Sequence, residues 1–158
     1  MKVVIQKVES CNLTVDDKVV SSIGAGLLVF VGVHKNDDIS CVKYLARKIS
    51  QMRLFKDENN KLNKSVLDLD GDVMVVSNFT LMAEISSGTR PSFSNGADFE
   101  TANNLYLQLA EEFKNNGIKN VQTGVFRSHM HLNTVLDGPF TIVMDKENKN
   151  EWKNKKVL

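Results

Sequence analysis

Two hydroxyl side chains, Ser77 and Thr80, are the first candidates for chemistry, because they stand close together in the stretch SNFT at the end of an apolar, strand-like run. A serine or threonine hydroxyl becomes a nucleophile when a nearby base removes its proton. No histidine is placed in the sequence to do this for Thr80. On this stretch alone, the more common interpretation is a turn at the end of a strand.

The stretch HMH raises the possibility of a metal site. Side chains alternate along a strand, so His129 and His131 are expected on one face, where two imidazoles could share a metal ion. A catalytic zinc usually has three protein ligands, and no third ligand stands out nearby in the sequence. We therefore expect two partly exposed histidines and no metal site.

The loop GTRPSF combines Arg90 with Phe93. An arginine can pair with a phosphate and a phenylalanine can stack on a base, which suits the single-stranded end of an RNA. A surface loop whose phenylalanine packs into the core explains the same residues. Without other observations, the surface loop is the simpler interpretation.

Pro139, one of only two prolines, stands in an unexpected place. It follows Gly138 at the start of the run FTIVM, which otherwise predicts a strand. Proline donates no backbone hydrogen bond and is rarely found inside a sheet. Glycine, which has no Cβ, lets the backbone approach a ligand closely. Strand formation alone therefore does not explain this pair.

The composition is typical of one globular domain: 158 residues, of which 42% are hydrophobic and 25% charged. The net charge of +1 neither indicates nor excludes a nucleic-acid partner.

The N-terminus lacks the apolar core of a signal peptide, and no apolar run approaches the roughly 20 residues of a membrane-spanning helix. Cys11 and Cys41 have no metal-ligand spacing, which indicates reduced thiols. We expect a cytoplasmic protein without membrane contact.

Hydrophobic patterns predict two helices and several strands. Apolar residues recur with helical spacing over 38–52, after Asp37 or Asp38 as N-cap, and over 98–117, which ends at Gly117. Strand patterns cover residues 2–8, 11–15, 19–23, 24–33, 52–55, 119–126, 129–135 and 139–145, and a turn followed by a strong strand covers 70–84. Such an order predicts an α+β fold: a single domain with a mostly antiparallel sheet or barrel-like layers and two main helices. Residues 1–145 are assigned to this domain and 146–158 to a charged C-terminal tail.

Several stretches in this order resemble one enzyme family over nearly the full chain: IQKV, GAGLLVFVGV, DGDVMVVSNFTLMAE, RPSF, TGVF and DGPFTI. The family is that of the D-aminoacyl-tRNA deacylases, also called D-tyrosyl-tRNA deacylases. SNFT stands where the family usually has Ser-Gln-Phe-Thr, and GPFT where it has Gly-Pro-Val-Thr. The resemblance implies hydrolysis of the ester between a D-amino acid, or mischarged glycine, and the 3′-terminal adenosine of tRNA.

The resemblance also implies how such a site is built. It implies a homodimer with its active sites at the interface, and neither a cofactor nor a metal ion. In the family the Gly-Pro bond is cis and enters the partner's site, so the carbonyls of Gly138 and Pro139 would exclude the side chain of an L-amino acid. Met130, Arg90 and Phe93 are the other expected substrate-binding residues.

The expected catalytic residues are Ser77, Asn78, Phe79 and Thr80. The resemblance implies that the backbone N–H groups of Asn78 and Phe79 face the ester carbonyl and stabilise the oxyanion. Thr80 would orient the substrate, and the 2′-OH of the terminal ribose would take part in the reaction.

Some residues depart from the family pattern and keep two alternatives open. Asn78 replaces the usual glutamine, and Arg127, Ser128 and His129 stand where glycine, alanine and an acidic or polar residue are common. One alternative is a catalytically weak relative that binds tRNA ends or another nucleic acid. The other is a deacylase shifted to a mischarged L-aminoacyl-tRNA through a trans Gly138–Pro139 bond.

Overall fold

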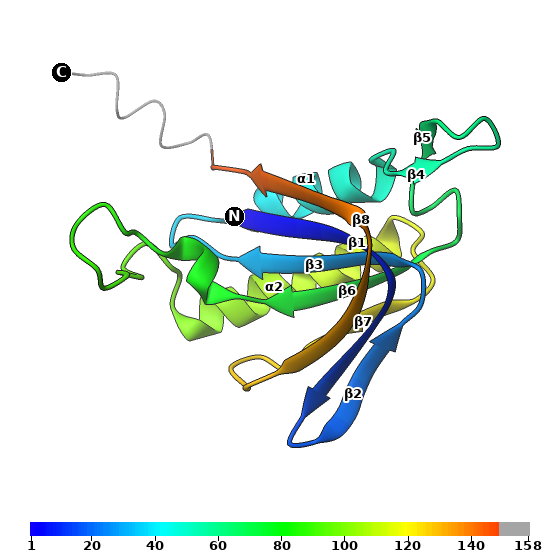
Figure 1. The fold of residues 1–158 in the computed structure, drawn as a ribbon. Coiled ribbons are helices and arrows are strands. Elements are labelled where there is room, and N and C mark those ends of the chain that lie inside the picture. Colours follow the sequence, from blue (N-terminus) through cyan, green and yellow to red (C-terminus); the bar gives the residue numbers. More distant parts are fainter. Residues whose placement is uncertain (149–158) are drawn as a thin grey trace, which may run out of the picture.

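A six-stranded sheet with two helices packed on one face forms the body of the protein (Figure 1). The computed structural model describes residues 1–148. The helices are α1 (Ile39–Gln51) and α2 (Phe99–Asn115), and a short 3-10 helix, η1, covers Phe79–Met82. The strands of the sheet are β1 (Lys2–Val15), β2 (Lys18–Ile23), β3 (Gly26–Gly32), β6 (Asp72–Ser77), β7 (Val121–Thr123) and β8 (His131–Asp145). A small separate hairpin joins β4 (Phe55–Lys56) and β5 (Leu62–Lys64).

The sheet is mixed and curls towards a barrel. Its order is β2-β1-β3-β6-β7, and β8 also pairs with β1. The pairs β1–β2, β1–β3 and β1–β8 are antiparallel, whereas β3–β6 and β6–β7 are parallel. The predicted α+β class with two main helices is thus confirmed. The parallel pairs place the carboxyl ends of β3 and β6 at the same edge.

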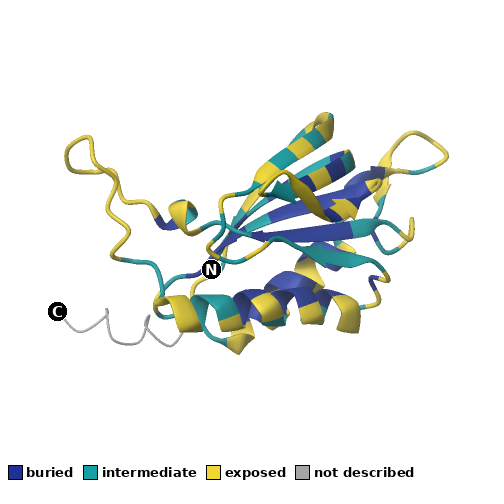
Figure 2. Cartoon of the chain, turned by 90° about the horizontal axis from the view of Figure 1, so that it is seen from below, coloured by how far each residue is buried: buried dark blue, intermediate teal, exposed yellow. Residues whose placement is uncertain are grey.

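Helix boundaries follow their capping residues. The side chain of Asp38 accepts a hydrogen bond of 2.9 Å from Ser40 N–H, and that of Asp98 accepts one of 2.9 Å from Thr101 N–H. Gly117 has a φ of 102°, which favours glycine just after the end of α2. The buried stripe of each helix faces the sheet (Figure 2). Both predicted helices are therefore confirmed to within about two residues at each end.

Several predicted strand boundaries are wrong, among them those of the strands expected at 52–55 and 119–126, which are observed as β4 and the shorter β7. The strands expected at 2–8 and 11–15 are one continuous strand, β1. The strand expected at 70–84 ends at Ser77, because the chain then turns into η1. There Leu81 N–H donates to Asn78 O at 3.2 Å and Ala83 N–H to Thr80 O at 3.1 Å, so these backbone groups are paired locally.

The proline in β8 lies in a bulge. The strands expected at 129–135 and 139–145 are one strand, in which Leu136 pairs with Val8 and Thr141 with Gln6. The four residues 137–140 therefore lie against Lys7 alone, and Pro139 interrupts no regular ladder position. The Gly138–Pro139 peptide bond is cis.

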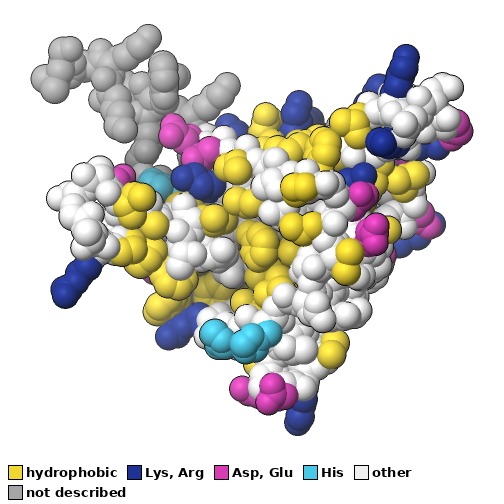
Figure 3. Space-filling model, in the orientation of Figure 1, with side chains coloured by type: hydrophobic (Ala, Val, Ile, Leu, Met, Phe, Trp, Pro, Cys, Tyr) yellow, Lys and Arg dark blue, Asp and Glu magenta, His cyan; other side chains and the backbone are white. Residues whose placement is uncertain are grey.

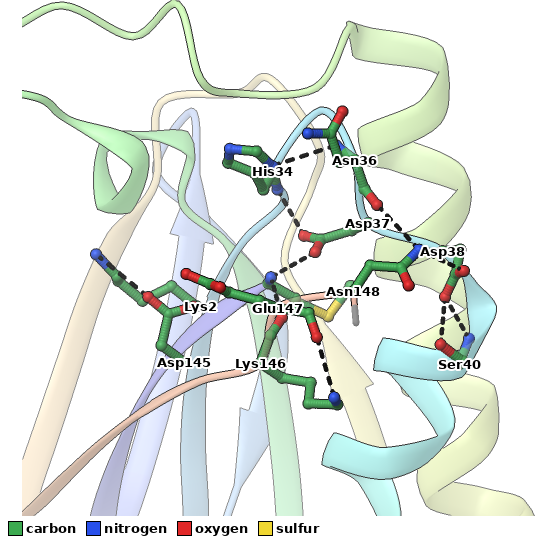
Figure 4. Close-up of polar contacts among 11 residues, drawn as sticks. Lys2, His34, Asn36, Asp37, Asp38, Ser40, Asp145, Lys146, Glu147 and Asn148 are labelled. Carbon is green, nitrogen blue, oxygen red and sulfur yellow. Dashed lines mark hydrogen bonds and ion pairs between the residues drawn. The ribbon is translucent and has the colours of Figure 1, made fainter. Parts of the chain in front are cut away.

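A buried ion pair ties the start of β1 to the start of α1 (Figure 4). The N-terminal ammonium group of Met1 lies 2.6 Å from Asp37 Oδ1 and donates to the carbonyl of Lys146 at 2.7 Å. Asn148 donates to Asp38 Oδ2 at 2.7 Å. The first residues of the predicted tail thus contact the body, and residues 149–158 lie outside the described part of the chain.

Both cysteines are buried and free. Burial raises the pKa of the thiols of Cys11 and Cys41, which disfavours the reactive thiolate. Across residues 1–148, no helix has both the length and the apolar character needed to cross a membrane.

Candidate active site

A cavity of about 670 Å³ opens beside the carboxyl ends of β3 and β6. The loop between β7 and β8 and the start of α2 complete its wall. Most of its lining is apolar: Phe30, Val31, Val33, Val76, Phe79, Phe93, Gly96, Ala97, Phe99, Ala102, Phe126, Met130 and Leu132. The other lining residues are Ser77, Asn78, Arg127, Ser128 and His129. In Figure 3 hydrophobic side chains (yellow) gather in a hollow on this face, above histidine side chains (cyan). An apolar cavity with few polar groups is typical of a small-ligand site.

The SNFT stretch borders this cavity. Ser77 ends β6, and Ser77, Asn78 and Phe79 line the cavity, whereas Thr80 does not. The hydroxyl of Thr80 donates to Asn78 Oδ1. An amide oxygen is not a base that could take the proton of a nucleophile, so the structure provides Thr80 with no activating partner within the described residues.

The two backbone N–H groups expected to bind the oxyanion differ in availability. Asn78 N–H donates to the carbonyl of Val31 at 2.8 Å, so it is used within the fold. Phe79 begins η1, where N–H groups have no acceptor in the same helix. Within residues 1–148 the N–H of Phe79 has no hydrogen-bond partner. Phe79 N–H is therefore the donor that remains available to a ligand.

Two phenylalanines form one side of the cavity mouth. The rings of Phe79 and Phe93 pack edge to face with centroids 4.9 Å apart, and 61% of Phe79 is exposed. Arg90, from the same loop as Phe93, is exposed and outside the lining, and makes no ion pair within the described part of the chain. The structure therefore brings Phe93, but not Arg90, to the cavity.

Tyr106 lies behind the cavity wall, where its ring stacks on that of the lining residue Phe126 with centroids 6.1 Å apart. Its hydroxyl lies 3.2 Å from Val75 O and 3.1 Å from Gly124 O, and donates its hydrogen to these carbonyls. Burial raises the pKa of Tyr106 to about 12, so it is a neutral donor at physiological pH. A Cβ on Gly124 would lie 2.7 Å from Met130 Sδ, which shows how closely Met130 packs there. The sequence placed Tyr106 only in the apolar stripe of a helix.

The segment 127–129, noted for its departures from the family pattern, lines the opposite side. Arg127 has a φ of 63°, and its Cζ lies 3.9 Å from the centre of the Phe99 ring. The rings of His129 and His131 pack edge to face at 4.9 Å. No group of three potential ligand side chains within residues 1–148 could hold a metal ion.

Gly138 and Pro139 do not line the cavity of their own chain. Their bulge lies over β1, where Lys7 Nζ is 2.8 Å from Asp137 Oδ2 and Thr141 donates to Gln6 Oε1 at 2.7 Å. One chain therefore presents the SNFT stretch and the GPFT stretch at two separate places.

Comparisons with known proteins agree on one family. The model of the family "D-Tyr-tRNA(Tyr) deacylase" matches residues 4–145. D-aminoacyl-tRNA deacylases from Thermotoga petrophila and Clostridioides difficile are 45% and 44% identical over 145 residues, covering 92% of this chain and 97% of each relative. The relative from Dictyoglomus turgidum is 39% identical over 156 residues, 99% of each chain.

Two solved structures share the fold. The c-Myc DNA unwinding element binding protein superposes with a TM-score of 0.88 at 31% identity, covering 94% of this chain and 100% of that one. A probable eukaryotic D-amino acid tRNA deacylase gives a TM-score of 0.82 at 16% identity over 92% and 98% of the two chains. By its sequence match along residues 4–145 and its full-length relatives, the chain belongs to the D-Tyr-tRNA(Tyr) deacylase family.

Proposed function

We propose that this protein is a D-aminoacyl-tRNA deacylase, which hydrolyses the ester between a D-amino acid and the 3′-terminal ribose of tRNA. The observation that carries this proposal is the family match along residues 4–145, which includes the whole cavity lining. The cavity of about 670 Å³ has the size of a small-ligand site and is open on one side, which suits the end of a tRNA. Such an enzyme works where aminoacyl-tRNA is made, in the cytoplasm.

Phe79 N–H stabilises the oxyanion that develops when the ester carbonyl is attacked. The proposal is supported by the position of this donor at the cavity and by its lack of a partner within residues 1–148. Thr80 positions the site through its hydrogen bond to Asn78 and is not the nucleophile. Water is the nucleophile in this proposal, and the neighbouring 2′-OH of the ribose assists its attack. This assignment is supported by Thr80, which has no base bonded to it within residues 1–148.

The active enzyme is a homodimer in which the partner's Gly-Pro bulge completes the cavity. The sheet face opposite the helices supports this part of the proposal, because it carries apolar side chains that the described part of one chain leaves partly exposed. On it Val4 pairs with Phe30 of β3 and with Val143 of β8, and 63% of Val143 is exposed. Phe30 also lines the cavity, so a second copy on this face would border the site.

Single-turnover deacylation of D-Tyr-tRNA and L-Tyr-tRNA tests the proposed activity. We expect release of D-tyrosine, with L-Tyr-tRNA left intact. Release of neither amino acid, with tRNA still bound, would indicate a binding protein. Release of L-tyrosine alone would indicate a deacylase of shifted specificity.

A substrate that ends in 2′-deoxyadenosine tests the role of the ribose. When it carries D-tyrosine at the 3′-OH, we expect normal binding and very slow hydrolysis. Full speed on this substrate would show that a protein group activates the nucleophile.

A further inference from the structure

Arg127 is the one residue with a full positive charge in the lining of the cavity, and no acidic residue stands with it there. Within residues 1–148 the guanidinium group of Arg127 forms no ion pair and no hydrogen bond. Its charge is therefore not neutralised by the fold. An arginine that is always charged and has five N–H donors is suited to bind an oxyanion.

The guanidinium group is also held in place. Its Cζ lies 3.9 Å from the centre of the Phe99 ring, which is a cation–π contact. Phe99 is the first residue of α2, whose start is fixed by the bonds from Thr101 N–H and Thr101 Oγ1 to Asp98, at 2.9 and 2.8 Å. The guanidinium N–H groups have no acceptor within residues 1–148, so they stay available to a ligand while Cζ lies over the ring.

The backbone at Arg127 forms a turn, which the hydrogen bond from Ser128 N–H to Val125 O closes at 3.2 Å. Its φ of 63° lies in the left-handed region, which side chains with a Cβ rarely occupy. Strained residues of this kind cluster at functional sites. An arginine at this position, with its charge unused by the fold, points to a ligand of opposite charge.

We propose that Arg127 is a substrate-recognition residue that binds an oxyanion of the aminoacyl-tRNA end. The inference rests on the proposed deacylase function. The shared chemistry is a negatively charged oxygen pair, and it has two sources in this substrate: a phosphodiester near the 3′-terminal nucleotide, or the side-chain carboxylate of an acidic D-amino acid. Both bind a guanidinium edge through two parallel hydrogen bonds.

The test compares wild type with Arg127→Gln on three substrates: D-Asp-tRNA, its neutral isostere D-Asn-tRNA, and D-Tyr-tRNA. Glutamine keeps a Cβ and a long chain at the same φ, so the backbone cost is matched. Arg47→Gln is the control, because Arg47 is exposed on α1, is outside the cavity lining and undergoes the same loss of charge. Circular dichroism and thermal unfolding verify that each variant is folded.

The two sources of the anion give different results. If the carboxylate is bound, Arg127→Gln lowers kcat/KM roughly ten- to hundredfold for D-Asp-tRNA and leaves D-Asn-tRNA within about twofold. If the phosphodiester is bound, Arg127→Gln lowers kcat/KM by a similar factor for all three substrates. The slope of log kcat/KM against log salt concentration then also becomes less steep by about one unit. Phe99→Leu removes the ring that contacts the guanidinium group. We expect it to lower kcat/KM for the same substrates, by a smaller factor than Arg127→Gln.

A binding measurement separates this inference from the proposed function. Non-hydrolysable analogues carry D-aspartate or D-asparagine in amide linkage on a 3′-amino RNA end, and their Kd is measured for both proteins. If wild type hydrolyses none of the substrates, the proposed function is overturned, while a weaker Kd for Arg127→Gln still supports anion binding. Equal Kd and equal kcat/KM for wild type and Arg127→Gln on every substrate would overturn the role of Arg127.

Discussion

Asn78 connects three parts of the site at the scale of single residues. Its N–H donates to Val31 on β3, its carbonyl accepts from Leu81 in η1, and its side chain accepts from Thr80. These contacts fix the turn that directs Phe79 N–H away from the sheet ladder. A shorter side chain than glutamine at this position is therefore compatible with a backbone-based oxyanion site.

Replacement of Thr80 by alanine should reduce the deacylation rate by about tenfold and not abolish it. The variant loses one hydrogen bond to Asn78 Oδ1, and one such bond contributes about 0.5–1.5 kcal/mol. Single-turnover deacylation of D-Tyr-tRNA measures the effect, with Thr80→Ser as the matched control that keeps the hydroxyl. An acyl-enzyme trapped on Thr80, or a rate at background, would contradict this role.

Tyr106 should make stability depend on pH above pH 10. Burial raises its pKa from 10.0 to about 12 in the folded state, so between these values the folded chain holds a proton that the unfolded chain has lost. Its contribution is complete below pH 10 and is lost as pH rises through 12, by roughly 2–3 kcal/mol.

Urea unfolding of wild type and Tyr106→Phe from pH 8 to pH 12 measures this contribution. At pH 8 the variant should be less stable by about 1–3 kcal/mol, because Val75 O and Gly124 O lose the hydrogen bond from the Tyr106 hydroxyl, although Val75 O still accepts from Gly124 N–H at 3.0 Å. The difference should shrink above pH 10. A constant difference over the whole range would show that Tyr106 does not titrate as described.

At the scale of elements, the close packing of η1 on β3 positions the turn at Asn78 and Phe79 that we propose as the oxyanion site. Gly32 ends β3, and a Cβ there would lie 2.9 Å from Leu81 Cβ and 3.1 Å from Asn78 O. Only glycine lets the segment 78–82 lie this close to the strand. The position of Phe79 N–H thus depends on a glycine that is distant in the sequence.

Gly32→Ala should displace η1, slow deacylation more than tenfold and destabilise the protein by about 1–3 kcal/mol. Gly24→Ala is the control, since a Cβ there would meet only Asp72 Oδ2 at an ordinary 3.7 Å. Single-turnover rates and thermal unfolding of both variants provide the measurement. Equal rates for the two variants would show that the η1 contact does not position the site.

At the scale of the whole molecule, the two faces of the sheet differ. One face is covered by α1 and α2, whereas the other presents Val4, Phe30 and Val143 at adjacent positions on three strands. Val143 is exposed and the other two are half-buried, and a group of apolar side chains that reaches the surface in this way often marks a protein interface. Through Phe30, this surface is continuous with the lining of the cavity.

Sedimentation at micromolar concentration should therefore show a species of twice 17.7 kDa. Val143→Lys should shift it towards the monomer and lower activity together with dimer content, because a charge would be buried without a partner. Val19→Lys is the control on β2, with a similar exposed fraction of 62%. A wild-type protein that sediments only as a 17.7 kDa species would contradict the homodimer.

Local sequence patterns were sufficient to predict the helices, most strand positions and the family. Helical spacing, the caps Asp38 and Asp98 and the turn at Gly117 are local signals, so the pattern of nearby residues was sufficient. The ends of the strands were harder to predict from the sequence. The chain leaves β6 at Ser77 because η1 packs on Gly32 of β3. That contact joins segments far apart in the sequence, so the residues near Ser77 do not predict it.

Which residues meet at the cavity depends on contacts between segments that are distant in the sequence. The tertiary structure brought Ser77, Asn78 and Phe79 together with Arg127 of a distant loop, and it left Arg90 outside. It also used the N–H of Asn78 for β3 and left that of Phe79 available. Hydrogen-bond partners and neighbouring charges depend on distances across the fold, and residue types along a chain do not specify those distances.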